Sequence, residues 1–79
     1  MKQKSYAVIG LGQFGMTLAL TLAEANCDVL VIDDTEENIQ DIAEKVTYAV
    51  KADVREPDTL KSLGVQNVDV VVVAVAENM

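Results

Sequence analysis

The 79-residue sequence predicts an α/β domain built on a doubly wound parallel sheet. Short runs of aliphatic and β-branched residues alternate along the chain with segments whose apolar residues recur at helical spacing. Those runs are apolar throughout, which is typical of strands covered by helices on both faces. A glycine-rich turn, Gly10–Gly15, also follows the first run directly and opens the first helical segment. Residues 1–79 are therefore interpreted as the N-terminal part of one such domain.

The first run, Tyr6–Ile9, predicts a strand, and Gln13–Ala25 predicts the helix that follows it. Asn26 ends that helix, since asparagine tolerates the left-handed conformation that is common after a helix. The stripe expected to face the sheet has the spacing i, i+4, i+8 and consists of Phe14, Leu18 and Leu22. A second apolar stripe is expected on the opposite side, as core of a larger domain or as an assembly surface: Met16, Leu20 and Ala23.

The second strand and helix are predicted at Val29–Ile32 and Thr35–Lys45. Asp34 precedes this helix and is a candidate N-cap, because its carboxylate can accept a hydrogen bond from an N–H group of the first turn. The residues of this helix expected to face inward are Ile39, Ile42 and Ala43.

The remaining elements are a strand at Thr47–Val50, a helix at Pro57–Leu63 that Gly64 ends, and a strand at Val70–Val73. Right-handed crossovers then give the strand order 3-2-1-4. This order places Val70–Val73 at an edge of the sheet, although four consecutive valines are typical of a sheet centre. We therefore expect that further chain or a second molecule completes the sheet.

Composition and charge exclude several classes of function. The formal net charge is −7 and the pI is about 4.2, so a nucleic-acid backbone would be repelled. The sequence holds no histidine and a single cysteine, Cys27, and it lacks the residue patterns of nucleophilic catalysis, thiolate metal sites and internal disulfides. No apolar run approaches the roughly 20 residues that span a bilayer. We expect a cytoplasmic protein that is not an enzyme and holds no metal.

The motif G-x-G-x-x-G occupies residues 10–15, directly after a predicted strand and at the start of a predicted helix. Gly10 permits a tight turn, Gly12 lets a pyrophosphate approach the backbone, and Gly15 allows the helix to pack closely on the strand. The unpaired N–H groups and the dipole at this helix end favour an anion. In this context the motif predicts a Rossmann-like nucleotide site.

Carboxylates follow the predicted strands at the same edge of the sheet. Asp33, 18 residues after Gly15, is placed to accept hydrogen bonds from both ribose hydroxyls of an adenosine, or else caps a helix. It disfavours NADP, whose 2′-phosphate would meet a negative charge with no adjacent arginine, and leaves NAD(H) and ATP/ADP open. Asp53 either contacts the adenine amino group or is a solvated loop carboxylate. Residues Ala74–Asn78 lie beside the switch point of the sheet, and their small side chains would leave room for a ligand.

Over essentially its whole length the sequence resembles the N-terminal nucleotide-binding half of the RCK (regulator of potassium conductance), or TrkA-type, domain. The resemblance begins with residues 6–15 and continues with Val29–Asp33. Its most specific part is a spaced pattern: Ala52-Asp53, Pro57, Leu60, Leu63-Gly64-Val65 and Val68–Ala74. Two positions depart from the family. Gln13 stands where many potassium-uptake members have arginine, and Val54-Arg55 replaces a small Ala-Thr or Ala-Ser pair.

The resemblance implies a cytosolic regulatory subunit at the inner face of the cell membrane, on a membrane-embedded potassium-translocating subunit. Like subunits would form homo-oligomers, as dimers that assemble into a ring. NAD(H) or ATP/ADP would bind as a regulatory ligand and gate potassium uptake. The expected binding residues are Gly10, Leu11, Gly12, Gln13, Phe14, Gly15, Asp33, Asp34, Asp53, Val54 and Ala74.

Two other functions share the glycine motif. The main alternative is the cofactor-binding domain of an NAD-dependent dehydrogenase separated from its catalytic domain, because residues 10–15 also resemble those of 2-hydroxyacid enzymes. That function would require a substrate domain with a proton donor beyond Met79. A methyltransferase cofactor domain fits less well, since the third glycine follows dinucleotide spacing.

Overall fold

The computed structural model describes residues 4–53, 55–62, 64 and 67–74. Strands and helices alternate along them in the predicted order: β1 (Ser5–Ile9), α1 (Gln13–Glu24), β2 (Asp28–Asp33), α2 (Glu36–Ile42), β3 (Tyr48–Lys51), α3 (Pro57–Ser62) and β4 (Val70–Val73). All strand pairs are parallel, and the order β3-β2-β1-β4 confirms the predicted doubly wound, Rossmann-like sheet.

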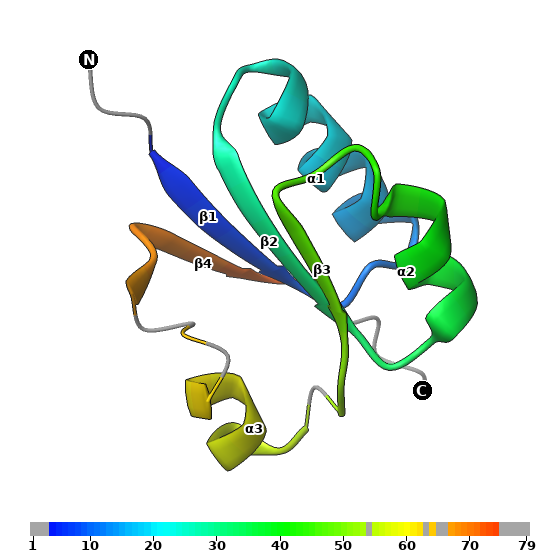
Figure 1. The fold of residues 1–79 in the computed structure, drawn as a ribbon, viewed down its shortest axis with the longest axis vertical. Coiled ribbons are helices and arrows are strands. Elements are labelled where there is room, and N and C mark those ends of the chain that lie inside the picture. Colours follow the sequence, from blue (N-terminus) through cyan, green and yellow to red (C-terminus); the bar gives the residue numbers. More distant parts are fainter. Residues whose placement is uncertain (1–3, 54, 63, 65–66, 75–79) are drawn as a thin grey trace.

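Strand β1 lies inside the sheet, between β2 and β4. Ile9, its last residue, is level with Ile32 of β2 on one side and with Val73 of β4 on the other. Helices α1 and α2 lie together on one side of the sheet, whereas α3 lies on the other side (Figure 1). Successive connections therefore diverge at the carboxyl end of β1, which is where ligands bind in sheets of this kind.

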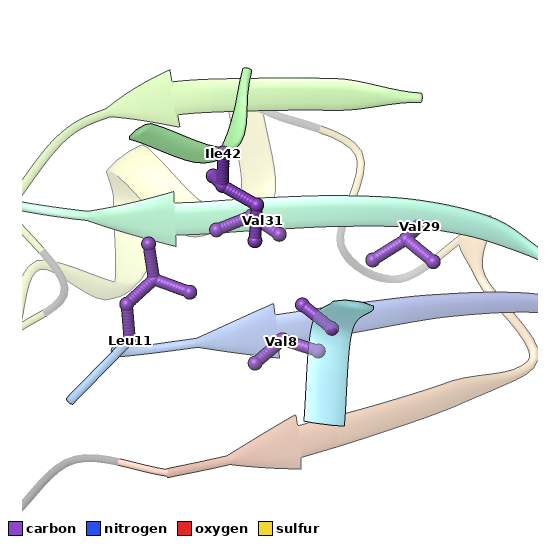
Figure 2. Close-up of a cluster of buried hydrophobic side chains, with 6 residues drawn as sticks. Val8, Leu11, Val29, Val31 and Ile42 are labelled. Carbon is purple, nitrogen blue, oxygen red and sulfur yellow. The ribbon is translucent and has the colours of Figure 1, made fainter. Parts of the chain in front are cut away.

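The core beneath α1 and α2 combines alternate residues of the central strands with residues of the turn and the helices (Figure 2). It consists of Val8, Leu11, Ala19, Val29, Val31 and Ile42, all buried. Ala7, Ile9 and Ile32 alternate with the strand members of this core and are buried as well. Both faces of the central strands are thus covered, as their continuous apolarity predicts.

The predicted orientation of α1 is only partly confirmed. Phe14 was expected against the sheet, but it is 67% exposed, and the buried residues of the helix are Gly15 and Ala19. Leu18 and Leu22 are half-buried at the margin of the core. The stripe expected on the opposite side also contacts the core: Met16, Leu20 and Ala23. The helix is rotated so that small residues face the strands, because it approaches the sheet too closely for a large side chain.

Helix α2 is shorter than predicted and begins differently. Ile42 is buried and Ile39 is half-buried, as expected, but Ala43 is exposed because the helix ends before it. The N-cap residue is Thr35, which makes no side-chain capping hydrogen bond, so the expectation that Asp34 caps this helix is wrong. Asn26 adopts the left-handed conformation predicted after α1, with φ of 65°.

Strand β4 lies at the edge of the four-stranded sheet, as predicted. Its side chains alternate between half-buried and exposed, and Val73 is 69% exposed. Leu63, the predicted end of the third helix, lies outside the described residues. Within the described part of the chain, no helix combines the length and apolarity needed to cross a membrane.

Candidate functional site

The turn between β1 and α1 is held by its backbone. Gly10 has φ of 88°, a left-handed conformation that glycine adopts without strain, and its N–H donates to the carbonyl oxygen of Ile32 at 2.8 Å. Gly12, with φ of 23°, is the N-cap residue of α1, and a Cβ placed there would meet no atom within 4 Å. The first N–H groups of a helix have no acceptor within the helix, so this open end of α1 can receive an anion.

Gly15 brings α1 onto the ends of two strands. A Cβ built at Gly15 would overlap with the carbonyl oxygen of Gly10 and would lie 3.3 Å from the Cβ of Ala74. Ala74 itself donates its N–H to the carbonyl oxygen of Ile9 at 2.8 Å. The glycine turn and the residue after β4 therefore lie in direct contact, as the sequence predicts for the switch point.

Three further residues of the glycine motif differ in how much of their side chain is exposed to solvent. The Leu11 side chain is 1% exposed and belongs to the core, so only its backbone is available to a ligand. Gln13 is exposed in the first turn of α1, and Phe14 follows it with its ring in solvent. These two side chains flank the open helix end.

Asp33, at the end of β2, is the buried charged residue of the described chain and is only 7% exposed. Its Oδ1 accepts a hydrogen bond from the Leu11 N–H at 3.4 Å, which places the carboxylate beside the glycine turn. Its Oδ2 accepts one from the Thr35 N–H at 3.4 Å and a shorter one, 2.9 Å, from Nδ2 of Asn38. The carboxylate thus ties the start of α2 to the turn, while binding of ribose by Asp33 stays a prediction.

Asp34 and Asp53 lie at the same edge of the sheet but are oriented differently. Asp34 is exposed, and its Oδ1 accepts from the Thr35 hydroxyl at 3.3 Å. Asp53 follows β3, whose connection to β2 continues through a 2.9 Å hydrogen bond from the Ala52 N–H to the Asp33 carbonyl oxygen. Val54, also an expected binding residue, lies outside the described residues.

Arg55 supplies the cation that the sequence analysis did not place at this edge. Oδ1 of Asp53 accepts from the Arg55 backbone N–H at 2.9 Å and from its Nε at 3.2 Å. Arg55 is also near enough to Asp34 for that charge to help raise the pKa of its guanidinium, after the larger effect of Asp53. Arg55 is paired with Asp53 and its side chain is mostly exposed, so the expectation that no arginine offsets the charge of Asp33 stays a prediction.

The pairing predicts how Asp53 titrates. The pKa of its carboxyl lies below the ordinary value because the Arg55 backbone N–H, and then its side chain, donate to the ionised form. A depressed pKa stabilises the fold above the unfolded-state pKa, and that contribution is lost as the pH falls through the folded-state pKa. We expect Arg55→Ala to raise the Asp53 pKa, measured by carboxyl NMR titration, only part of the way, because the backbone hydrogen bond remains. Lys51→Ala, which removes the partner of Glu36 instead, should leave it unchanged.

Sequence reasoning missed Asn38 as a partner of Asp33. One signal was present: Thr35 and Asn38 have the spacing of a capping box, in which the third residue of a helix reaches back to its start. Here Asn38 reaches past Thr35 to the carboxylate that ends β2. This contact depends on where α2 begins, which is one residue later than predicted.

The sequence matches a known protein family. Residues 6–79 match the family model of the TrkA-N domain. The chain belongs to the TrkA-N family. TrkA-N is a nucleotide-binding domain of Rossmann-like fold, so the family agrees with the glycine turn and with the sheet described above. The resemblance to RCK and TrkA-type domains stated from the sequence is confirmed.

Potassium uptake proteins are among the relatives of this TrkA-N chain. It is 38% identical over 77 residues to Ktr system potassium uptake protein C of Bacillus subtilis, covering 98% of this chain and 35% of that protein. It is 39% identical over 79 residues to Ktr system potassium uptake protein A of the same organism, covering 100% and 36%. Trk system potassium uptake protein TrkA of Vibrio alginolyticus is 30% identical over 66 residues, 82% of this chain and 14% of that protein. The chain spans about a third of the length of the two Bacillus relatives.

Proposed function

We propose that this TrkA-N domain binds NAD(H) or ATP/ADP as a regulatory ligand and thereby gates potassium uptake by an associated channel or transporter. The observation that carries the proposal is the contact between Asp33 and the glycine turn: a buried carboxylate lies beside the open end of α1. Backbone N–H groups for phosphate and a carboxylate for ribose are the two elements that dinucleotide folds combine at this position. The Ktr and Trk relatives support a role in potassium transport.

The proposed ligand lies across the carboxyl end of β1. Its phosphates contact the first turn of α1 at Gly12 and Gln13, and its ribose hydroxyls bind Asp33. The adenine then extends toward Asp53, with Ala74 leaving space on the other side of the turn. We propose that NADP is disfavoured, because its 2′-phosphate would lie against the Asp33 carboxylate. Arg55 does not remove this repulsion, since Asp53 already engages its guanidinium.

Regulation of potassium uptake requires a membrane partner and two conformational states of the assembly. We propose that the protein acts at the inner face of the cell membrane, as a homo-oligomeric ring on a membrane-embedded potassium-translocating subunit. A ligand shifts such an assembly only if it binds the two states with different affinity, and coupling is typically about 1–3 kcal/mol. A regulatory role is favoured over that of an enzyme because the relatives are potassium uptake proteins.

Direct binding tests the proposal. We expect titration calorimetry with NADH, NAD⁺, ADP and ATP to detect binding of at least one of them at one ligand per chain, and NADPH to bind more weakly than NADH. Mass spectrometry of the purified protein under native conditions identifies any ligand it retains. If none of the four nucleotides binds, the proposed function is wrong. If NAD⁺ is reduced with an organic substrate, the dehydrogenase alternative replaces it.

A gain of affinity is expected on replacing Gln13 with arginine. Gln13 is exposed in the first turn of α1, so the longer side chain fits without repacking. A guanidinium there can form charge-assisted hydrogen bonds with phosphate oxygens, which glutamine cannot match. We expect ATP to bind about tenfold more tightly by calorimetry, corresponding to about 1.4 kcal/mol.

Gln40→Arg is the matched control for this gain. It adds the same charge at an exposed glutamine of α2, whose amide contacts Glu36 and not the glycine turn. If both variants raise the ATP affinity equally, the effect is one of net charge and the phosphates do not lie at Gln13.

A further inference from the structure

We propose that Asn38 is a positioning residue that sets the orientation of the Asp33 carboxylate, and so makes the site select ligands with intact ribose hydroxyls. The inference rests on the proposed function, because it concerns how the same site holds the sugar of its nucleotide. Asn38 itself need not touch the ligand; it acts through Asp33.

The distances single out Asn38 among the partners of Asp33. Its Nδ2 donates to Oδ2 at 2.9 Å, the usual length of a strong N–H···O bond. The two backbone donors to the same carboxylate, Leu11 N–H and Thr35 N–H, are both 3.4 Å away. Hydrogen bonds weaken beyond about 3.2 Å, so the side chain of Asn38 is the tightest restraint on this carboxylate.

A restraint is needed because the last torsion of an aspartate is soft. Rotation about the bond to the carboxylate has a broad, roughly two-fold profile rather than three sharp wells. Backbone contacts at 3.4 Å alone would leave the plane of the carboxylate loosely defined. The Asn38 bond fixes Oδ2 toward α2, which leaves Oδ1 on the side of the glycine turn, where it already meets the Leu11 N–H.

The division between the two oxygens explains how one buried carboxylate serves both fold and ligand. An ionised carboxylate offers about four acceptor positions. The two contacts from α2 and its start occupy Oδ2, and one contact from the turn occupies Oδ1. The remaining acceptor position is therefore on Oδ1, where the Leu11 contact, at 3.4 Å, is also long enough to be exchanged for a ribose hydroxyl. Without Asn38, the carboxylate is free to turn away from that geometry.

Asn38 lies in the first turn of α2, on a helix of seven residues whose start is otherwise uncapped by side chains. It is half-buried, so its replacement by a smaller residue removes the hydrogen bond without opening a large internal cavity. A purely structural role would loosen the start of α2 and weaken every ligand alike. If Asn38 positions Asp33, its replacement weakens only the part of the affinity that the ribose hydroxyls provide.

The experiment compares ADP with 2′,3′-dideoxyADP, which keeps the base and phosphates but lacks both hydroxyls. Calorimetry on the purified protein is expected to show ADP binding about tenfold or more tightly than the dideoxy analogue, the scale of a hydrogen bond to a charged group. In Asn38→Ala this ratio should fall to about twofold or less, while the affinity for dideoxyADP stays the same. The control is Gln40→Ala, which removes another side-chain amide of α2 that bonds Glu36, and should retain the wild-type ratio.

Each other outcome counts against the inference in a recognisable way. If Asn38→Ala weakens both ligands by the same factor, the residue is only structural, and if the ratio is unchanged it does not position Asp33. If circular dichroism shows that Asn38→Ala is unfolded, Asn38→Ser is measured in its place. Serine suits a helix start but is too short to reach Oδ2. If the wild-type protein binds ADP and dideoxyADP with equal affinity, the inference about Asn38 is overturned, but nucleotide binding itself is not. If none of ADP, ATP, NADH and NAD⁺ binds, the proposed function is overturned with it.

Discussion

Gly15→Ala is expected to destabilise the domain by about 3 kcal/mol or more, since overpacking a tight contact costs up to about this amount and occasionally exceeds it. The added Cβ would overlap with the carbonyl oxygen of Gly10 and press on Ala74, and neither obstacle is the end of a flexible side chain. Helix α1 would have to move away from the ends of β1 and β4. Domains of this size are only marginally stable, so urea denaturation should show a largely unfolded protein, or a midpoint far below that of wild type.

Gly12→Ala is the matched control, because it adds the same methyl group in the same turn. A Cβ at Gly12 meets no atom within 4 Å, so the expected cost comes from the backbone alone, whose φ of 23° and ψ of −170° are rarely adopted by residues other than glycine, about 1–3 kcal/mol. The domain should remain folded, but the methyl group would stand where the phosphates approach, and nucleotide affinity should fall. If both variants lose stability equally, close packing of α1 is not what requires glycine at position 15.

Asp33→Ala is expected to lower both stability and affinity. Removal of the carboxylate leaves the Leu11 and Thr35 N–H groups and the Asn38 amide without this acceptor, at a cost of about 1–3 kcal/mol in the free energy of unfolding. Loss of the charge-assisted hydrogen bonds to ribose should weaken binding of ADP or NADH by a further 1–3 kcal/mol, or about 5- to 150-fold. Urea denaturation measures the first effect, and calorimetry on the folded fraction measures the second.

Asp34→Ala separates these effects from a change of net charge. Asp34 is the next residue along the chain and carries the same charge, but it is exposed, and its carboxylate accepts a hydrogen bond from the Thr35 hydroxyl. Asp34 was among the expected binding residues, but its hydrogen bond goes to Thr35 and not to the glycine turn. We therefore expect Asp34→Ala to have the free energy of unfolding of wild type and a nucleotide affinity within about twofold of it. If Asp34→Ala weakens binding as much as Asp33→Ala, the ribose contact has been assigned to the wrong carboxylate.

Most of the fold could be predicted because it depends on periodicity and topology. Continuous apolar runs distinguished buried parallel strands, and right-handed crossovers then left one order for four strands. The rotation of α1 could not be predicted in the same way. A stripe chosen by hydrophobicity places Phe14 inward, whereas the contact at the Gly10 carbonyl leaves no room for a Cβ at position 15, and the other buried residue of the helix is Ala19.

The candidate site was predicted in its position but not in its internal contacts. The glycine spacing locates the turn, and the strand order brings Asp33 and Ala74 beside it, because Asp33 ends β2 and Ala74 follows β4, the two strands that flank β1. The contacts of Asn38 with Asp33 and of Arg55 with Asp53 were found only in the structure. The contact of Asn38 depends on a helix start one residue later than expected, and that of Arg55 depends on a short turn in which it folds back onto Asp53.

The anchoring of the glycine turn has a consequence for the thermodynamics of ligand capture. The turn is bonded to β2 through Gly10 and Ile32, and it packs through Gly15 against the residue that follows β4. Its amides are therefore oriented before a ligand arrives, and binding should cost little conformational entropy in this loop. Such preorganisation predicts fast association with the phosphates, without rearrangement of the glycine turn.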